Sequence, residues 1–175
     1  ELIEQFSLER VSKSGAKFEY EKGKWFNHQY LQLKSNEELA EQFMPILDTK
    51  LSTLNLQLST FNSQPSLETV SKVIGLTKDR VNFVSELWEQ VNFFFVAPEK
   101  YDEKSLKKRW KEDSPKHMTE MLALLEVHED WSAEGLDNLI MPWIAEKEYG
   151  VGIVMNAFRI CLVGAARGPH IWNIT

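Results

Sequence analysis

The sequence predicts an all-α protein, a bundle of short antiparallel helices, from three observations. Apolar residues recur at intervals of three and four through most of the chain, which is the period of one helical face. No stretch shows the alternation of apolar and polar residues that a half-buried strand would have. Capping residues or prolines precede several of the periodic stretches, and glycines follow some of them. Because no repeat of fixed period is present, a solenoid is not expected.

The N-terminal region is predicted to connect two helices. Residues 1–6 have the pattern of a last helical turn without an initiating methionine, so the chain reads as a piece of a longer protein. Residues 7–18 are polar, contain glycine and lack a helical period. Residues 19–33 regain the period, which predicts a helix with Asn27 and His28 on or near its exposed side. The residues of the predicted inward face are Trp25, Phe26, Tyr30 and Leu33.

Two helices with capping serines are predicted next. The segment Ser35–Glu38 has the pattern of a capping box for a helix that runs to about Asp48, and Pro45 is expected to kink or shorten it. Ser66 is expected to cap a second helix, which Gly75 ends. The predicted inward residues are Leu39, Phe43, Ile46 and Leu47 in the first helix and Leu67, Val70, Val73 and Ile74 in the second.

A single helix is predicted to begin at Thr77 and to end in the dense apolar run of residues 93–96. Its predicted inward residues are Val81, Val84, Leu87, Trp88 and Val91. Arg80 falls near the start of this helix beside Lys78, where a positive charge opposes the helix dipole by some tenths of a kcal/mol. An arginine there suggests a role outside local stability. Residues 98–102 are the best candidate for a domain boundary.

The second half of the chain is predicted to contain two more capped helices. Ser114 precedes Pro115 in the order favoured at a helix start, and Ser132 is expected to cap a helix that Gly150 ends. Their predicted inward residues are Met118, Met121, Leu122 and Leu125, then Leu136, Leu139, Ile140, Trp143 and Ile144. Basic residues gather in residues 104–111, for which a solvated helix face is the default interpretation.

The last predicted long helix carries an arginine at the edge of its apolar face. The spacing of residues 155–163 places Arg159 at the rim of a core, and Gly164 is expected to stop the helix. An arginine at such a rim more often covers apolar neighbours than binds a ligand.

A corner is predicted after this helix. Pro169, preceded by Gly168, suits the first turn of a new helix, because its missing N–H would be unpaired there in any case. The loop between the two helices carries Arg167 and little bulk. No Asp or Glu occurs from Tyr149 to Thr175. The corner is therefore a candidate site for an anionic or polar ligand.

Composition restricts the classes of function. The chain has 175 residues, enough for one or two domains, and its formal charge of −6 argues against broad, non-specific nucleic-acid binding while permitting local contacts. Neither DNA nor a membrane is expected as a partner, since no apolar run approaches the roughly 20 residues of a membrane span. The single cysteine, Cys161, cannot form an internal disulfide, which fits a reducing, cytoplasmic compartment.

The sequence contains no constellation of residues for catalysis or for metal binding. The histidines are scattered and show no ligand spacing with Cys161 or with a pair of carboxylates. They are His28, His117, His128 and His170. We therefore assign no catalytic residue and no metal.

Both ends of the chain resemble bacterial glutamyl-tRNA synthetases. The segment after that family's catalytic domain is similar to Phe6-Ser7-Leu8-Glu9-Arg10-Val11, Lys13-Ser14-Gly15-Ala16, Phe18, Glu21-Lys22, Trp25, Asn27 and Tyr30. The family's anticodon-reading corner is similar to Phe158-Arg159 with Leu162 and Gly164, followed by Gly168-Pro169 and Ile171-Trp172. The resemblance covers residues 6–172 in order and is specific at the two ends.

The resemblance implies a class I aminoacyl-tRNA synthetase, a cytoplasmic monomer that uses ATP with Mg to attach glutamate to tRNA(Glu). This chain would be its C-terminal half without the catalytic domain, so by itself it is expected to bind no cofactor and to be inactive. Residues 1–34 would end the stem-contact segment and residues 35–99 would form a first helical anticodon-binding subdomain. Residues 100–175 would form a second one, truncated at its C-terminus.

The resemblance also implies which residues contact tRNA. By motif position, the family's base-contacting residues fall on Arg80, Arg159, Gly168, Pro169 and Ile171. Unstacked anticodon bases suit guanidinium donors, backbone groups and apolar packing of this kind. Further tRNA contacts are expected at Lys78, Asn27 and Arg167. The sequence departs from the family pattern at Gly23, Val163 and His170, and it leaves open which base each residue reads and whether tRNA(Gln) is also a substrate.

Two other classes of function stay open from the sequence. A helical protein–protein interaction domain is favoured by the net acidity and by the aromatic-rich residues 93–96. A small stand-alone enzyme is disfavoured by the missing catalytic constellation. The anticodon-binding hypothesis makes a distinguishing prediction, because it needs Arg80, Arg159 and Arg167 on one side of the molecule.

Overall fold

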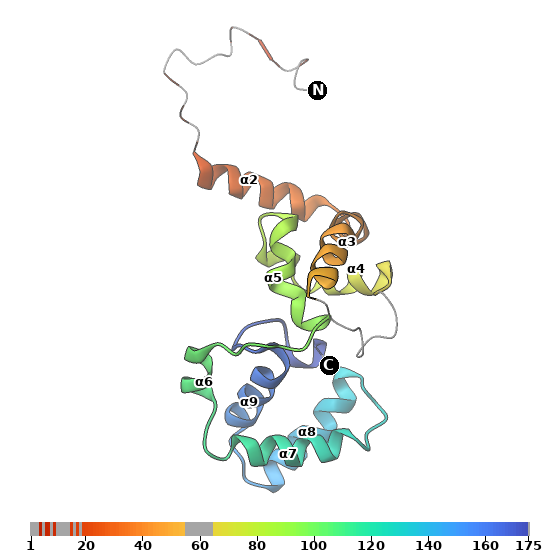
Figure 1. The fold of residues 1–175 in the computed structure, drawn as a ribbon, viewed down its shortest axis with the longest axis vertical. Coiled ribbons are helices and arrows are strands. Elements are labelled where there is room, and N and C mark those ends of the chain that lie inside the picture. Colours follow the sequence, from red (N-terminus) through yellow and green to blue (C-terminus); the bar gives the residue numbers. More distant parts are fainter. Residues whose placement is uncertain are drawn as a thin grey trace.

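The computed structural model describes residues 19–54 and 65–174, together with residues 4, 6, 7, 9, 15 and 17. Every regular element in that part of the chain is a helix, which confirms the all-α prediction. Figure 1 shows an elongated molecule in which the helices between residues 20 and 91 occupy one half and those between residues 103 and 163 the other. Apart from isolated positions, the predictions for residues 1–18 lie outside the described residues.

The first half is held together by one hydrophobic core. The helices that contribute most to it are α3 (Asn36–Thr53), α4 (Leu67–Gly75) and α5 (Leu87–Val91). Phe43 and Ile74, which the sequence placed inward, are fully buried, but the inward placement of Leu67 is wrong, because this first residue of α4 is 40% exposed. Burying a side chain of this size stabilises the fold by about 1.5 to 3 kcal/mol before the entropy of ordering it is counted.

The predicted capping box is present at the start of α3. The N–H of Glu38 donates to the Ser35 hydroxyl at 3.1 Å, and the N–H of Ser35 donates to the Glu38 carboxylate at 2.8 Å. The predicted end of this helix is wrong, because α3 continues past Pro45 to Thr53. Beyond the proline, Leu47 and Leu51 continue the buried stripe, and their packing offsets the hydrogen bond that a proline removes.

The single helix predicted from Thr77 is wrong, since the segment is a series of short pieces. They are η2 (Lys78–Arg80), η3 (Val84–Glu86), α5 and η4 (Asn92–Phe94), where η marks a 3-10 helix. Thr77 is buried and donates its hydroxyl to the carbonyl of Val73 at 3.2 Å, so it does not cap a new helix. Val81, Leu87, Trp88 and Val91 are nevertheless buried as predicted.

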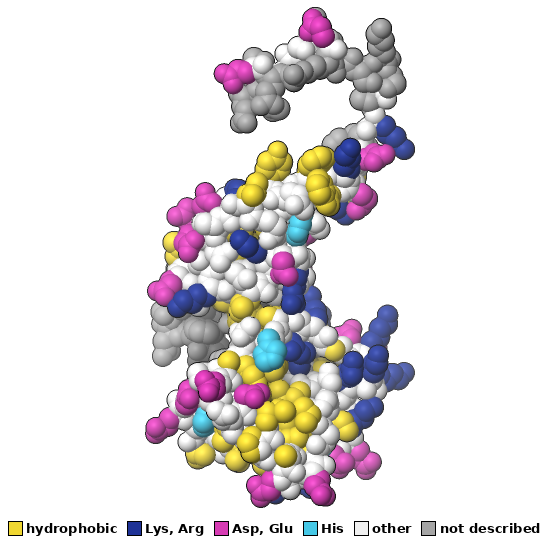
Figure 2. Space-filling view, turned by 180° about the vertical axis from the view of Figure 1, so that it is seen from behind, with side chains coloured by type: hydrophobic (Ala, Val, Ile, Leu, Met, Phe, Trp, Pro, Cys, Tyr) yellow, Lys and Arg dark blue, Asp and Glu magenta, His cyan; other side chains and the backbone are white. Residues whose placement is uncertain are grey.

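The helix predicted over residues 19–33 is α2 (Tyr20–Leu33), but its predicted orientation is wrong. Its exposed apolar and aromatic residues are Tyr20, Trp25, Phe26, Tyr30 and Leu33. Leu31 is the buried residue, and Asn27 and His28 share its face because they precede it by four and three positions. Helical spacing shows which residues share a face but not which face is covered. Figure 2 shows the exposed hydrophobic side chains of this end of the molecule in yellow.

The second half contains a separate cluster of buried residues. Its elements are α6 (Glu103–Arg109), α7 (Ser114–Leu125), α8 (Ala133–Glu146), α9 (Val151–Val163) and η5 (Ile171–Asn173). Met121, Leu136, Ile140 and Ile144 lie fully inside it, as the sequence predicted. The predicted cap Ser132 accepts the N–H of Gly135 at 3.0 Å. None of the described helices is long and apolar enough to cross a membrane.

The two halves are joined at the end of α9. Gly164 ends that helix, as predicted, with a φ of 76°, a left-handed conformation in which glycine is strongly favoured. Its carbonyl accepts the N–H of Asp102 at 2.8 Å, which fixes the connecting segment against the helix end. A side chain at Gly164 would lie 2.8 Å from the carbonyl oxygen of Lys100 and 2.9 Å from Cβ of Pro98, so the close approach of the two segments depends on glycine.

Candidate nucleic-acid interface

Arg159 is half-buried at the rim of the second core, where the sequence placed it. Its Nη1 donates to two backbone carbonyls of the following corner, that of Pro169 at 2.7 Å and that of Arg167 at 3.2 Å. A guanidinium has further donors on Nη2 and Nε, and no residue in the described part of the chain bonds to them. Arg159 thus holds the corner while it keeps a fork of donors for a ligand.

The charge of Arg80 acts on Arg159, although the two residues lie in different halves. Burial is the main reason that the pKa of Arg159 is below its usual value, and the positive charge of Arg80 lowers that pKa further. Within the described residues, Arg159 makes no ion pair, and Arg80 has only Asp79, with Nε and Oδ1 3.8 Å apart on partly exposed side chains. Such an exposed pair contributes little. Two interacting guanidiniums with so little compensating charge favour a negatively charged or electron-rich partner.

Arg80 is positioned by α2, through residues whose orientation the sequence did not predict. Gln32 donates to the carbonyl of Lys78 at 2.8 Å, and His28 Nδ1 lies 2.8 Å from the carbonyl of Val81. These contacts hold both ends of the turn that carries Arg80. The sequence did carry a signal for this orientation. The side chains around Leu31 on α2 are polar, and such a face can point inward when backbone carbonyls accept its hydrogen bonds.

Two residues that were expected to contact tRNA also make contacts within the protein. Asn27 donates its side-chain amide to the carbonyl of Asn82, and the Lys78 ammonium donates to the carbonyl of Lys34 at 3.3 Å. Both side chains therefore fasten α2 to the segment that carries Arg80. Any effect of these residues on RNA binding is expected to pass through Arg80.

We expect Asn27→Ala to lower the free energy of unfolding by about 1 kcal/mol, because it leaves the half-buried carbonyl of Asn82 without its partner. Thermal denaturation measures this loss. Gln29→Ala is the matched control, since Gln29 lies on the same helix with an exposed side chain, and its unfolding free energy is expected to stay within about 0.5 kcal/mol. Equal stability of the two variants would contradict the inward orientation of Asn27.

The corner after α9 differs from its predicted form. No helix begins at Pro169; the short η5 begins at Ile171 and has three residues. Gly168 has a φ of 111°, and a side chain there would lie 3.4 Å from Nη1 of Arg159 and 3.5 Å from the Phe93 ring. The prediction that a new helix begins at Pro169 is therefore wrong, because only the short η5 follows the corner.

Pro169 and Ile171 are buried, and Ile171 is only 5% exposed. Next to them, the indole N–H of Trp172 donates to the Asp137 carboxylate at 2.9 Å, which anchors the corner to α8. The side chains of Pro169 and Ile171 thus support the corner from within. Surface contacts of this segment come from exposed His170, half-buried Gly168 and the backbone.

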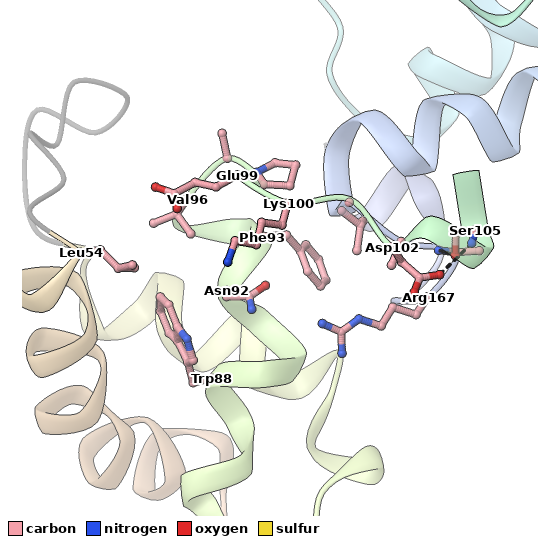
Figure 3. Close-up of a pocket in the computed structure, with 16 residues that line it drawn as sticks. Leu54, Trp88, Asn92, Phe93, Val96, Glu99, Lys100, Asp102, Ser105 and Arg167 are labelled. Carbon is pink, nitrogen blue, oxygen red and sulfur yellow. Dashed lines mark hydrogen bonds between the residues drawn. The ribbon is translucent and has the colours of Figure 1, made fainter. Parts of the chain in front are cut away.

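Arg167 is exposed and borders a cleft of about 630 Å³ between the two halves. Residues on the first half that line it include Trp88, Asn92 and Phe93, and the Ala97–Lys100 segment forms another wall. Figure 3 shows the Arg167 guanidinium pointing from the corner toward the side of the cleft that carries Asn92. The sequence did not predict this cleft, because the apolar pattern of residues 93–96 indicated only the end of a helix.

No group that suggests catalysis accompanies these basic residues. In the described part of the chain, no three His, Cys, Asp or Glu side chains come together as metal ligands do. The thiol of Cys161 is half-buried, and burial raises its pKa, which disfavours the reactive thiolate.

Comparison with known proteins places this arrangement in a family. The family model described as "Anticodon binding domain" matches residues 30–175. A glutamate–tRNA ligase of Bacteroides thetaiotaomicron is 51% identical over 175 residues, which are 100% of this chain and 32% of the relative. The glutamate–tRNA ligase of Bacteroides fragilis is 53% identical over the same shares.

A solved structure agrees with these relatives. The crystal structure of a glutamate tRNA ligase from Elizabethkingia meningosepticum, in complex with its amino acid, superposes with a TM-score of 0.81 at 37% identity. The match covers 99% of the present chain and 32% of the Elizabethkingia chain. This chain thus spans about a third of the length of the relatives that it matches. Since the family model extends over most of the chain, including Arg80, Arg159 and the corner, the chain belongs to the anticodon-binding domain family.

Proposed function

We propose that this chain is the tRNA anticodon-binding part of a glutamate–tRNA ligase whose full-length form attaches glutamate to tRNA(Glu) with ATP. The observation that carries the proposal is Arg159, which the corner carbonyls fix while its remaining donors stay unoccupied, with the positive charge of Arg80 acting on it. The relatives' names support the type of ligase, and the matched family supports the type of binding.

The chemistry of the site suits the reading of unstacked bases. The edges of a base present carbonyl oxygens and ring nitrogens, which a planar guanidinium can bond in pairs. Arg159 is held by its Nη1, so its fork has little freedom to lose on binding. Arg80 would read a second position in the same way, and Gly168 would admit close approach of RNA to the backbone. In this proposal Pro169 and Ile171 act by fixing the shape of the corner.

The remaining functional assignments rest on the same proposal. Residues 1–34 end the stem-contact segment, residues 35–99 form the first anticodon-binding subdomain and residues 100–175 the second; the two separate clusters of buried residues support this division. ATP with Mg is bound by the rest of the ligase, which acts as a cytoplasmic monomer on tRNA(Glu).

One observation favours the alternative of a protein interaction domain. The aromatic face of α2 is exposed, with Trp25 at 56% and Tyr30 at 67%. In the ligase proposal, the rest of the longer enzyme covers this face. The alternative gives no reason for Arg159 to be held at the corner with donors that no described residue occupies, so we favour RNA binding.

The proposal is tested by the affinity of the chain for transcripts of tRNA(Glu) with the natural anticodon and with each anticodon base replaced. We expect substitution of a base that is read to weaken binding by about 1 to 3 kcal/mol, which is about 5- to 150-fold. A transcript with a changed base pair in the acceptor stem is the control, and its affinity is expected to be unchanged. Equal affinity for every anticodon would contradict the proposal.

A further inference from the structure

The short helix α6 has two faces of different character. Ser105, Leu106 and Arg109 are half-buried. Lys104, Lys107 and Lys108 are exposed, and their spacing of three and four places them on one face, which we call the basic face of α6. Exposed Lys111 follows the helix at the next step of the same spacing. Figure 2 shows dark-blue side chains gathered along one edge of this half of the molecule.

Local stability accounts for only part of this basic face. Lys107 and Lys108 lie in the last turn, where they favour the helix dipole, but Lys104 lies in the first turn and opposes it. None of the four lysines forms an ion pair with a carboxylate among the described residues. The chain as a whole is acidic, with a formal charge of −6. Acidic residues flank the basic face, namely Asp102 and Glu103 before it and Glu112 and Asp113 after it.

Hydrogen bonds fix α6 to the corner that Arg159 holds. The Ser105 hydroxyl accepts the N–H of Ala166 at 3.1 Å, and the N–H of Asp102 donates to the carbonyl of Gly164 at 2.8 Å. The next residue, Arg167, offers its carbonyl to Nη1 of Arg159 at 3.2 Å. The corner is therefore held between Arg159 on one side and α6 on the other, so the basic face keeps a constant position relative to the arginines.

From this geometry we propose that the basic face of α6 binds the phosphate backbone of the same RNA whose anticodon the corner reads. This inference rests on the proposed function and adds a second site with a different task. Lysine ammonium groups bind phosphates as point charges and read no sequence. The basic face thus supplies affinity and fixes the position of the RNA strand, while Arg159 and Arg80 supply discrimination between anticodon bases. Phosphate contacts release counterions, so their contribution appears in the salt dependence of binding.

The test compares two double variants of equal charge change. Lys107→Gln with Lys108→Gln removes half of the exposed lysines in this run, in the last turn of α6. Lys50→Gln with Lys147→Gln is the matched control, because these lysines are also exposed and lie in the last turn of α3 and at the C-cap of α8. The affinity of the 175-residue chain for the tRNA(Glu) transcript is measured over a series of salt concentrations, with natural and substituted anticodons.

We expect the α6 variant to reduce the slope of log affinity against log salt by about 1.4 to 1.8, that is, about 0.7 to 0.9 for each phosphate that the variant no longer binds. The ratio of affinities for natural and substituted anticodons should stay unchanged, and the control should keep the slope of the original chain. A slope that falls no more than in the control overturns the inference, as does a loss of discrimination at an unchanged slope. If the unsubstituted chain binds natural and substituted anticodons with equal affinity, the proposed function fails. The slopes of log affinity against log salt still decide whether α6 contacts phosphates. If the unsubstituted chain binds no transcript at all, both fail.

Discussion

Arg159→Ala in the full-length ligase is expected to reduce discrimination between natural and substituted anticodons by about 1 to 3 kcal/mol. The alanine removes the donors that the proposed function places against the RNA. It also removes both bonds from Nη1 to the corner, whose carbonyls at Arg167 and Pro169 lose their partner. Each of those bonds is worth about 0.5 to 1.5 kcal/mol, so the corner itself is expected to loosen. Discrimination is measured as the ratio of charging efficiencies on the two kinds of transcript.

Arg159→Lys separates base reading from general attraction to phosphate. Lysine keeps the positive charge, but its single ammonium group cannot hold two carbonyls and also present a planar fork. We therefore expect the lysine variant to lose most of the discrimination that alanine loses. Arg109→Ala is a suitable control, because Arg109 is half-buried like Arg159 but lies on α6. If Arg159→Ala lowers charging equally for every anticodon, or if circular dichroism shows an unfolded domain, the assignment of Arg159 as a base reader is wrong.

Gly164→Ala is expected to lower the free energy of unfolding by about 2 to 4 kcal/mol. A non-glycine residue in a strained backbone conformation costs about 1 to 3 kcal/mol, and Gly164 has a φ of 76°. The added Cβ would also lie 2.8 Å from the carbonyl oxygen of Lys100, so the connecting segment must move away. Since this segment carries the N–H of Asp102 that bonds to Gly164, the contact between α9 and the start of α6 is expected to weaken.

Gly152→Ala provides the matched control on the same helix. Gly152 lies in the first turn of α9, and a Cβ there would meet only the side chain of Asn156, at 4.0 Å. Alanine at this position is expected to change the free energy of unfolding by no more than about 0.5 kcal/mol. Denaturant unfolding followed by circular dichroism measures both variants. Similar unfolding free energies for the two alanine variants would show that Gly164 is not required at the junction.

Where the local pattern matched the packing, the sequence predicted the fold well. The capping box at Ser35–Glu38 and most buried positions of α3 and α8 follow from spacing within one helix, whereas Leu122 of α7, which was predicted to point inward, is 56% exposed. The pieces between Thr77 and Phe94 were not predicted, although their apolar residues were. A period of three and four is compatible with both helix types, and only tertiary packing broke this segment into 3-10 turns.

The candidate site was predicted only in part. Arg159 was recognised at the rim of its helix, and the resemblance pointed to Arg80, yet neither signal showed that the charge of Arg80 acts on Arg159. Asn27 and Lys78, for which tRNA contacts stay a prediction, both bond to backbone carbonyls of the protein, which the sequence did not show. Pro169 and Ile171 were expected to contact a base. Both residues are buried, which limits the side-chain surface that they can offer to RNA.

The sequence by itself determined the helical class, most of the buried residues, the glycine stop at the end of α9 and the presence of an arginine at its rim. These features depend on neighbours within about one helical turn, whose spacing can be read along the chain. Only the tertiary structure decided which face of α2 is covered, that Gln32 and His28 of α2 contact the turn that carries Arg80, and that α6 is tied to the corner through Ser105 and Ala166. Each of these contacts joins residues distant in the sequence, and the packing of whole helices, rather than the period of any one of them, brings such residues together.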